Sequence, residues 1–308
     1  MPIIYFLFGF LSTFLVHPFH LTLPESGEPP LHADSNELLL EQGIEAFYDT
    51  DWVSSSEIFE KVKANSPDDP RPYFFESMMP FLEYFLVNPT EELADQFLIL
   101  SEKAVDLSEK RLSSSPSDTT MVLLLSGLHG YRGLVAADQD RHRIALSSGL
   151  TGFNYTRQLL SLGSDRPDAR IGRGMFYYMI GSIPSGMRWA SNIVGLRASI
   201  EDGFDELKIA AKSDSYVSND AKMMLMYLYE KEERYEESLF YAVQLTEKLP
   251  DNVIFLYKKA EIYEQLNNMD DALDVYREIV RKDNPRLKSV TVMSEKKISE
   301  IEKLTLNY

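Results

Sequence analysis

The stretch Val253–Pro285, VIFLYKKAEIYEQLNNMDDALDVYREIVRKDNP, decides the fold of this chain. Its apolar residues recur at helical spacing on both sides of a polar turn, which predicts two consecutive helices. Small residues, Ala260 and Ala272, stand at the eighth and twentieth positions, where they let two helix axes approach closely. Large residues that can fill the space on either side stand at the fourth, eleventh and twenty-fourth positions: Leu256, Tyr263 and Tyr276.

The same pattern occurs in two further stretches. Asn219–Pro250 precedes the first stretch in a shared 34-residue frame and has Met226 at its eighth position. Asn36–Pro67 lies far upstream and has Gly43 and Ser55 at its eighth and twentieth positions. A proline follows the second helix in each stretch, where it stops that helix and prepares the next turn. Self-similarity at a fixed period indicates a repeat array rather than a helical bundle.

These spacings resemble the tetratricopeptide repeat (TPR), with clear repeats near residues 36–69, 219–252 and 253–286. The resemblance implies an all-α fold, a TPR-like right-handed solenoid of antiparallel helix pairs. A divergent central section and a C-terminal cap helix from Ser294 complete the expected array. The resemblance also implies a surface that binds other polypeptides.

Helical spacing continues between the clear repeats in a looser form. Residues 71–112 predict a hairpin with a long second helix, and residues 121–137 and 141–162 predict another pair. Asp168–Ile180 resembles the first helix of a repeat, and Ser199–Lys212 supplies its partner.

The central sequence YYMIGSIPSGMRWASNIVGLRASIEDGFDELKIAAKSD, residues 177–214, carries a second and fainter likeness. A break of the type G-x-x-P followed by a helix pair is similar to the eukaryotic tetratricopeptide-protein-39 and inclusion-body-clearance family. It is also similar to bacterial TRAP-transporter T-components. This likeness keeps a second function open, that of an accessory solute-binding subunit of a transporter.

Two glycines in that sequence, Gly181 and Gly186, stand five residues apart, as glycines do in a phosphate-binding loop. Such a loop needs a strand before it, and a lysine with a serine or threonine after it. Here a tyrosine-rich helix comes before, and Met187 and Arg188 come after. Because Pro184 cannot continue the preceding helix and Gly181 suits its C-terminal end, we predict a helix break instead.

Composition excludes several classes of function. The 308 residues carry a formal net charge of −17, so the surface repels nucleic acid and we expect no nucleic-acid partner. There is no cysteine, which excludes thiol catalysis, cysteine-bound zinc and disulfides. The five histidines and the paired carboxylates have no spacing typical of a triad, a metal site or a nucleotide fingerprint. We therefore predict no enzymatic activity, no cofactor and no metal.

The N-terminal segment bears on localisation. Ile3–Val16 is an uncharged apolar run, shorter than the roughly 20 residues that span a bilayer. We divide the chain into this signal or anchor (residues 1–16), a linker (17–35) and the repeat domain (36–308). The expected location is exported, periplasmic or tethered to a membrane through this segment alone. Because no basic residue precedes the run, a cytoplasmic chain with an apolar tail is the alternative.

Arginines are concentrated in the middle of the chain. From His129 to Ile200 there are nine arginines and no lysine, against four aspartates. Arginine binds carboxylates through paired hydrogen bonds, so one hypothesis is a groove for an acidic segment or a C-terminus. The alternative is that these arginines pair with acidic neighbours in adjacent repeats. The candidate partner-binding residues are Arg132, Arg170, Arg173, Tyr177, Tyr178, Arg188 and Trp189.

The repeats and the arginine cluster together predict a non-catalytic scaffold for protein–protein interaction. The solute-binding subunit is the alternative, with the same arginines and aromatic residues around a small anion. Stabilisation of the protein by small carboxylates rather than by polypeptides would distinguish the two.

Overall fold

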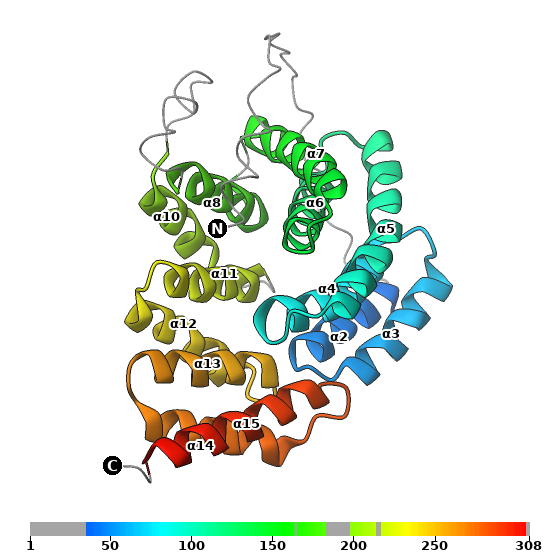
Figure 1. The fold of residues 1–308 in the computed structure, drawn as a ribbon. Coiled ribbons are helices and arrows are strands. Elements are labelled where there is room, and N and C mark those ends of the chain that lie inside the picture. Colours follow the sequence, from blue (N-terminus) through cyan, green and yellow to red (C-terminus); the bar gives the residue numbers. More distant parts are fainter. Residues whose placement is uncertain (1–34, 164, 183–197, 214–216, 306–308) are drawn as a thin grey trace.

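A computed structural model describes residues 35–163, 165–182, 198–213 and 217–305. Within those residues all regular secondary structure is helical, as the repeat pattern predicts (Figure 1). The helices form successive pairs, followed by one last helix. The pairs are α2 (Ser35–Tyr48) with α3 (Trp52–Asn65), α4 (Pro70–Leu86) with α5 (Glu91–Ser114), α6 (Thr119–Asp138) with α7 (His142–Ser161), α8 (Pro167–Gly181) with α10 (Ile200–Ala210), α11 (Val217–Lys231) with α12 (Tyr235–Lys248), and α13 (Val253–Gln265) with α14 (Met269–Lys282); α15 (Lys288–Thr305) follows them.

Side-chain caps start several helices where the polar residues of the turns indicate. At α3, the Asp51 carboxylate accepts a hydrogen bond from the Ser54 N–H, which satisfies one of the four unpaired donors of a helix start. At α10, Ser199 and Asp202 form a reciprocal capping box. The predicted cap helix begins at Lys288, six residues before the expected Ser294. The helix starts earlier because Val290, in its first turn, is fully buried in the hydrophobic core.

Small residues bring the two helices of the pairs α2–α3 and α11–α12 into contact. The Ser55 hydroxyl donates to the Gly43 carbonyl at 2.9 Å, and the Ser238 hydroxyl donates to the Met226 carbonyl at 2.7 Å. Both pairs join the twentieth position of the repeat to the eighth. The close approach that the spacing predicts is therefore confirmed, and the serines add a hydrogen bond across it.

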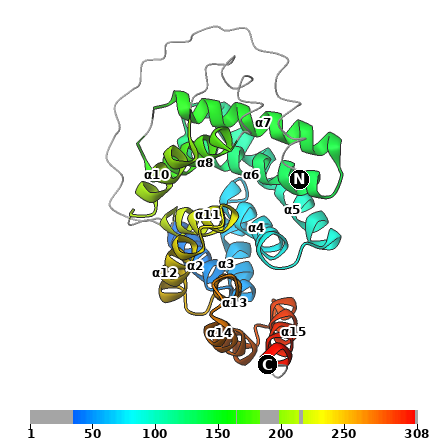
Figure 2. The same ribbon diagram turned by 60° about the vertical axis from the view of Figure 1, so that its left-hand side comes forward.

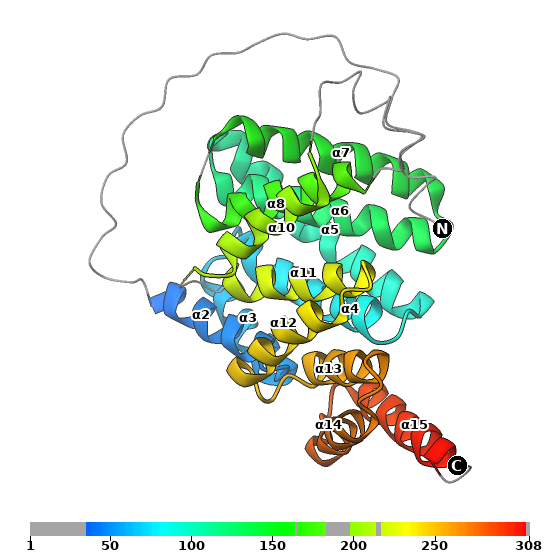
Figure 3. The same cartoon turned by 90° about the vertical axis from the view of Figure 1, so that its left-hand side faces the viewer.

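The solenoid curls until its first hairpin touches its last repeats. In all three views the blue helices α2 and α3 lie beside the yellow and orange helices of the C-terminal half (Figures 1, 2 and 3). Tyr48 at the end of α2 donates to Asp220 on α11 at 2.5 Å, and Thr50 donates to the Asp251 carbonyl at 3.1 Å. The array is therefore a closed ring, whereas the repeat pattern alone predicts a row of pairs.

The break at the central glycines begins as predicted. Helix α8 ends at Gly181, and Pro184 and Gly186 lie outside the described residues, as do the segment Ile3–Val16 and most of the linker. Among the helices that are described, none combines the length and the apolar character needed to cross a membrane.

Candidate functional site

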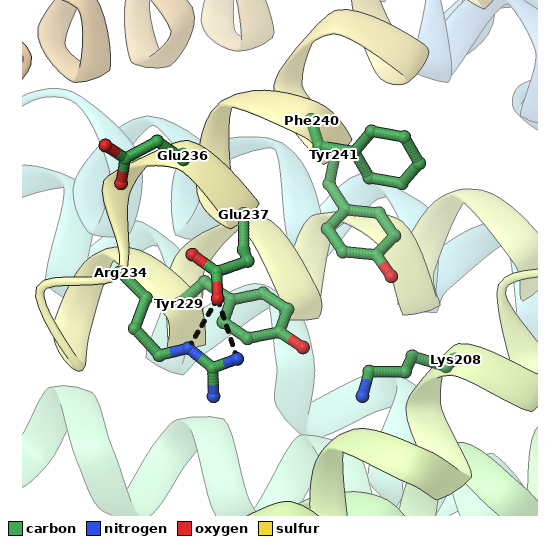
Figure 4. A pocket seen from close by; sticks show the side chains of 7 residues that line it. All are labelled: Lys208, Tyr229, Arg234, Glu236, Glu237, Phe240 and Tyr241. Carbon is green, nitrogen blue, oxygen red and sulfur yellow. Dashed lines mark hydrogen bonds and ion pairs between the residues drawn. The ribbon is translucent and has the colours of Figure 1, made fainter.

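A surface cleft of about 420 Å³ lies where three consecutive helices meet, α10, α11 and α12 (Figure 4). Helix α10 contributes Lys208, α11 contributes Tyr229, and Arg234 stands in the turn before α12. Helix α12 itself contributes the rest of the lining: Glu236, Glu237, Phe240 and Tyr241. The cleft thus joins two adjacent repeats, and its lining is mostly aromatic and charged.

The floor of the cleft is a stack of flat groups. The Tyr229 ring lies 4.1 Å from the Phe204 ring at an interplanar angle of 7°, and 5.9 Å from the nearly parallel Tyr241 ring. The Arg234 guanidinium carbon lies 4.5 Å from the centre of the Tyr229 ring, which adds a cation–π contact. Because these groups come from all three helices, the stack holds the cleft in one shape.

The charged side chains around the cleft are paired. Arg234 bonds to Glu237 at 2.7 Å and reaches Glu201 of the preceding repeat at 2.7 Å. The hydrogen bond from Arg234 lowers the pKa of Glu237. Lys208 pairs with Asp205 at 3.1 Å. Burial by itself would lower the pKa of Lys208. The interactions with Asp205 and the Tyr229 hydroxyl outweigh burial and raise that pKa above its usual value, so the ammonium group is charged at neutral pH.

The cleft presents an apolar rim and a polar centre. Phe240 is 59% exposed and packs edge-to-face on Tyr241, with ring centres 5.1 Å apart. Figure 4 shows the hydroxyl groups of Tyr229 and Tyr241 directed toward the Lys208 ammonium group. A cleft of this kind can accept an apolar side chain at its rim and a hydrogen-bond acceptor at its centre.

Two of the arginines proposed from the sequence, Arg170 and Arg173 on α8, meet at one carboxylate. Each donates to the same Glu206 oxygen on α10 at 2.9 Å, and Arg170 also bonds to Asp165 at 2.9 Å. The hydrogen bond to Glu206 raises the pKa of Arg173. The structure thus places this pair of arginines in ion pairs within their own helix pair, α8 and α10, whereas the sequence alternative was pairing with acidic residues of adjacent repeats.

The other proposed residues are spread over different contacts. Arg132 on α6 bonds to the Leu98 carbonyl and to the Ser101 hydroxyl on α5. The Tyr178 hydroxyl donates to Glu232 at 2.7 Å, and its ring is buried against Phe204. Tyr177 is partly exposed on α8, and Arg188 and Trp189 lie outside the described residues.

None of the proposed residues that the structure describes lines the cleft between α10 and α12. The sequence pattern did not single out the cleft residues, because they occupy either a core position of the repeat frame or none of its defining positions. Tyr229 occupies the eleventh position of its repeat and reads as core, and it is indeed 2% exposed. One signal was available in the sequence, since Phe240 falls on the polar face of α12, where a helix that only packs would carry a polar residue.

The histidines and acidic residues of the described chain form no cluster that could hold a metal ion. His129 stacks on Tyr155 with ring centres 5.8 Å apart and lies 3.8 Å from Glu109. Burial lowers the pKa of His129. It is a packed side chain between two helices.

Comparisons with known proteins agree with the repeat pattern. No family model matches this chain. Over 60 residues, 20% of this chain, the sequence is 40% identical to a TPR repeat-containing protein of Methanocaldococcus jannaschii, and the match spans only 19% of that relative. Two solved structures are similar along most of the chain. They are a tetratricopeptide repeat protein from Parabacteroides merdae (16% identity, 88% of this chain and 99% of that one, TM-score 0.33) and the TPR domain of P58(IPK) (15% identity, 89% and 99%, TM-score 0.28).

The shared 34-residue frame, the paired helices and the sequence match lead to the same conclusion. This chain is a curved array of antiparallel helix pairs that resembles TPR proteins in its repeat frame and over the 60 residues that match.

Proposed function

We propose that this chain is a scaffold that binds a polypeptide partner and performs no chemistry of its own. The observation that carries the proposal is the preformed cleft between α10, α11 and α12. Its aromatic floor is already fixed by the Phe204–Tyr229–Tyr241 stack and by Arg234. A partner that binds there orders few protein side chains, so less of the interaction energy is lost to conformational entropy.

The lining indicates the chemistry of the partner. The exposed Phe240 ring offers an apolar contact, and Lys208 is a charged donor whose present partner, Asp205, is 70% exposed at its side chain. A carboxylate of the partner can take the place of Asp205 because an exposed ion pair contributes little to stability. The proposed ligand is therefore a short acidic segment, or a C-terminus, with an apolar side chain beside the carboxylate.

Substitution of Phe240 tests this assignment. Peptides selected on the wild-type protein from a displayed random library are measured again on Phe240→Ala. Loss of an aromatic side chain that a partner covers on binding weakens the interaction about tenfold or more where that side chain is a hot spot. The matched control is Ile99→Ala on α5, since Ile99 is 67% exposed and lies far from α12 in the sequence. We expect unchanged binding in the control.

Equal binding by Phe240→Ala and wild type would contradict the cleft as the site. The double variant Arg170→Gln, Arg173→Gln tests the arginine hypothesis in the same assay. Selection of no peptide, together with thermal stabilisation by small carboxylates, would favour the solute-binding alternative.

We extend the proposal to a chain that is exported or tethered through Ile3–Val16, and mass spectrometry of the N-terminus of host-purified protein tests that extension.

A further inference from the structure

The turn between α2 and α3 is held by residues some 200 positions further along the chain. Tyr48 and Thr50 hydrogen-bond to the loop before α13, and Thr50 also contacts the loop before α15. Thr50 is only 1% exposed. These contacts lie apart from the cleft at α10–α12, and they are what closes the ring.

Two asparagines of the C-terminal half bind the main chain of this turn. The side-chain oxygen of Asn252 accepts from the Phe255 N–H at 2.8 Å, and its amide nitrogen donates to the Tyr48 carbonyl at 2.5 Å. Asn284 does the same one repeat later: its oxygen accepts from Leu287 at 3.2 Å, and its nitrogen donates to the Thr50 carbonyl at 3.0 Å.

This arrangement is a site for a polypeptide backbone. The N–H groups of the following helix fix each oxygen on the helix side, so each amide nitrogen must face the turn. Because each amide nitrogen donates to a main-chain carbonyl, which every residue has, the two asparagines can bind a backbone of any sequence. The same device stands in two adjacent repeats, at Asn252 and Asn284, and the α2–α3 turn occupies both.

Thr50 is an unusual residue for its backbone conformation. Its φ is +57°, and the matching turns of three other pairs place Asp140, Glu233 and Asn267 at φ values of +55° to +59°. A β-branched residue is strained in this region, whereas asparagine and aspartate tolerate it. The Thr50 hydroxyl donates to the Asp251 carbonyl and accepts from the Val253 N–H at 3.4 Å. Threonine is therefore unfavourable for the backbone conformation of this turn, but its hydroxyl makes the hydrogen bonds to Asp251 and Val253.

Closure also covers an aromatic part of α11. The Phe85 ring at the end of α4 lies 4.5 Å from the Tyr227 ring of α11, and Ser289 before the middle of α15 donates to Glu83. Both contacts join the N-terminal pairs to the C-terminal repeats. Release of the turn would remove the hydrogen bonds of Tyr48 and Thr50 to the C-terminal repeats, leaving the Ser289–Glu83 bond and the ring contact to hold these surfaces together.

We propose that residues 48–51 are an intramolecular ligand: they occupy a backbone-binding site on the last repeats, latch the array into a ring, and keep the Phe85–Tyr227 surface covered. When the turn is released, that site and that surface become accessible to a partner's main chain. The contact is autoinhibitory for this second surface.

The test breaks the latch from either side. Thr50→Val keeps the shape of the side chain and removes its hydroxyl. Asn252→Asp keeps the oxygen that caps α13 and replaces the donor facing Tyr48 with a carboxylate, which repels that carbonyl. The controls are Thr151→Val, whose hydroxyl bonds only within α7, and Asn268→Asp, which makes no side-chain cap at α14.

Ring opening is measured by electron–electron double resonance. The natural chain has no cysteine, so spin labels go onto Glu57→Cys in α3 and Glu247→Cys in α12, both exposed. We expect one narrow distance distribution in wild type and controls, and a longer second population in both latch variants, larger by about tenfold than in wild type. Thr50→Ser should restore the narrow distribution.

Hydroxyl-radical footprinting of the same proteins reports the covered surface. Oxidation of Phe85 and Tyr227 should increase several-fold in the latch variants, while Phe59 and Phe97, fully buried within their own pairs, stay protected. Protection of these two also shows that the helix pairs remain folded. A distance distribution and a footprint identical to wild type in both latch variants would overturn the proposal. Oxidation of Phe59 together with Tyr227 would also overturn it, because it means unfolding rather than release.

Discussion

Asp220 is a carboxylate placed where the chain closes on itself. It accepts a hydrogen bond from the Tyr48 hydroxyl at 2.5 Å. Burial raises the pKa of Asp220 to about 6, and the bond from Tyr48 opposes that change only in part. The charge of Asp220 in turn contributes to the raised pKa of Tyr131, whose main cause is burial. The folded chain thus binds the proton of Asp220 more tightly than the unfolded chain does.

This gives the stability of the fold a pH dependence. The folded pKa of Asp220 is raised, so between pH 4 and 6 the folded chain keeps a proton that the unfolded chain releases. The contribution of Asp220 to the free energy of unfolding therefore falls as the pH rises through that window. Asp220→Asn keeps an acceptor for Tyr48 and removes the titration. We expect the variant to match wild type near pH 4 and to exceed it at pH 8, by at most about 3 kcal/mol. Urea unfolding at both pH values measures this, and an equal pH dependence in the two proteins would contradict it.

At the scale of elements, the helix pairs depend on small residues at fixed positions. A Cβ added to Gly43 would stand 2.5 Å from a ring carbon of Phe59, which is fully buried. In α8 and α10 the backbones themselves meet, since a Cβ on Gly203 would stand 2.6 Å from the Tyr178 nitrogen. The small residues at fixed positions of the repeat therefore mark the points where two helices approach most closely.

Gly43→Ala tests that packing, because alanine is otherwise the better helix former. At an unobstructed helical position, replacing glycine by alanine stabilises by up to about 1 kcal/mol. Gly130→Ala on α6 is such a control, since nothing lies within 4 Å of the added Cβ. For Gly43→Ala we expect destabilisation of about 1–3 kcal/mol from overpacking against Phe59. Equilibrium unfolding in urea should move the two midpoints in opposite directions, and movement in the same direction would refute the packing argument.

For the whole molecule, closure changes how the array should unfold. In an open array each repeat contacts only its neighbours, so the ends can unfold separately. Here the first pair contacts the last repeats through Tyr48, Thr50 and Asn284. Contacts between the two ends make the unfolding of one depend on the unfolding of the other. We expect a more cooperative transition than an open array of this length would give.

Trp52 offers a probe of the first pair alone. The chain has two tryptophans, so Trp189→Phe leaves Trp52, which is 3% exposed, as the single fluorophore. In that background, Trp52 fluorescence and far-ultraviolet circular dichroism should report the same urea midpoint. Thr50→Val should move the fluorescence midpoint to lower urea than the dichroism midpoint. Coincident midpoints in both proteins would show that the latch does not couple the ends.

The candidate cleft shows where prediction from the sequence stops. The arginine-rich composition indicated residues 129–200 as the binding region. In the structure, however, Arg170 and Arg173 both bind Glu206 on the neighbouring helix α10. Phe240 and Lys208 lie in different repeats and carry no joint signal in the sequence. A cleft is made by the relative placement of elements, and charge counted along the chain does not say which charges are already paired.

The sequence by itself determined the helices, their pairing and their close contacts, because those depend on residues at most 34 positions apart, within reach of periodic spacing. Only the tertiary structure decided the cleft and the closed ring. Curvature accumulates in small rotations from pair to pair, and no local pattern encodes their sum. Whether Thr50 meets Asp251, 201 residues later, depends on that sum, and therefore on the whole chain.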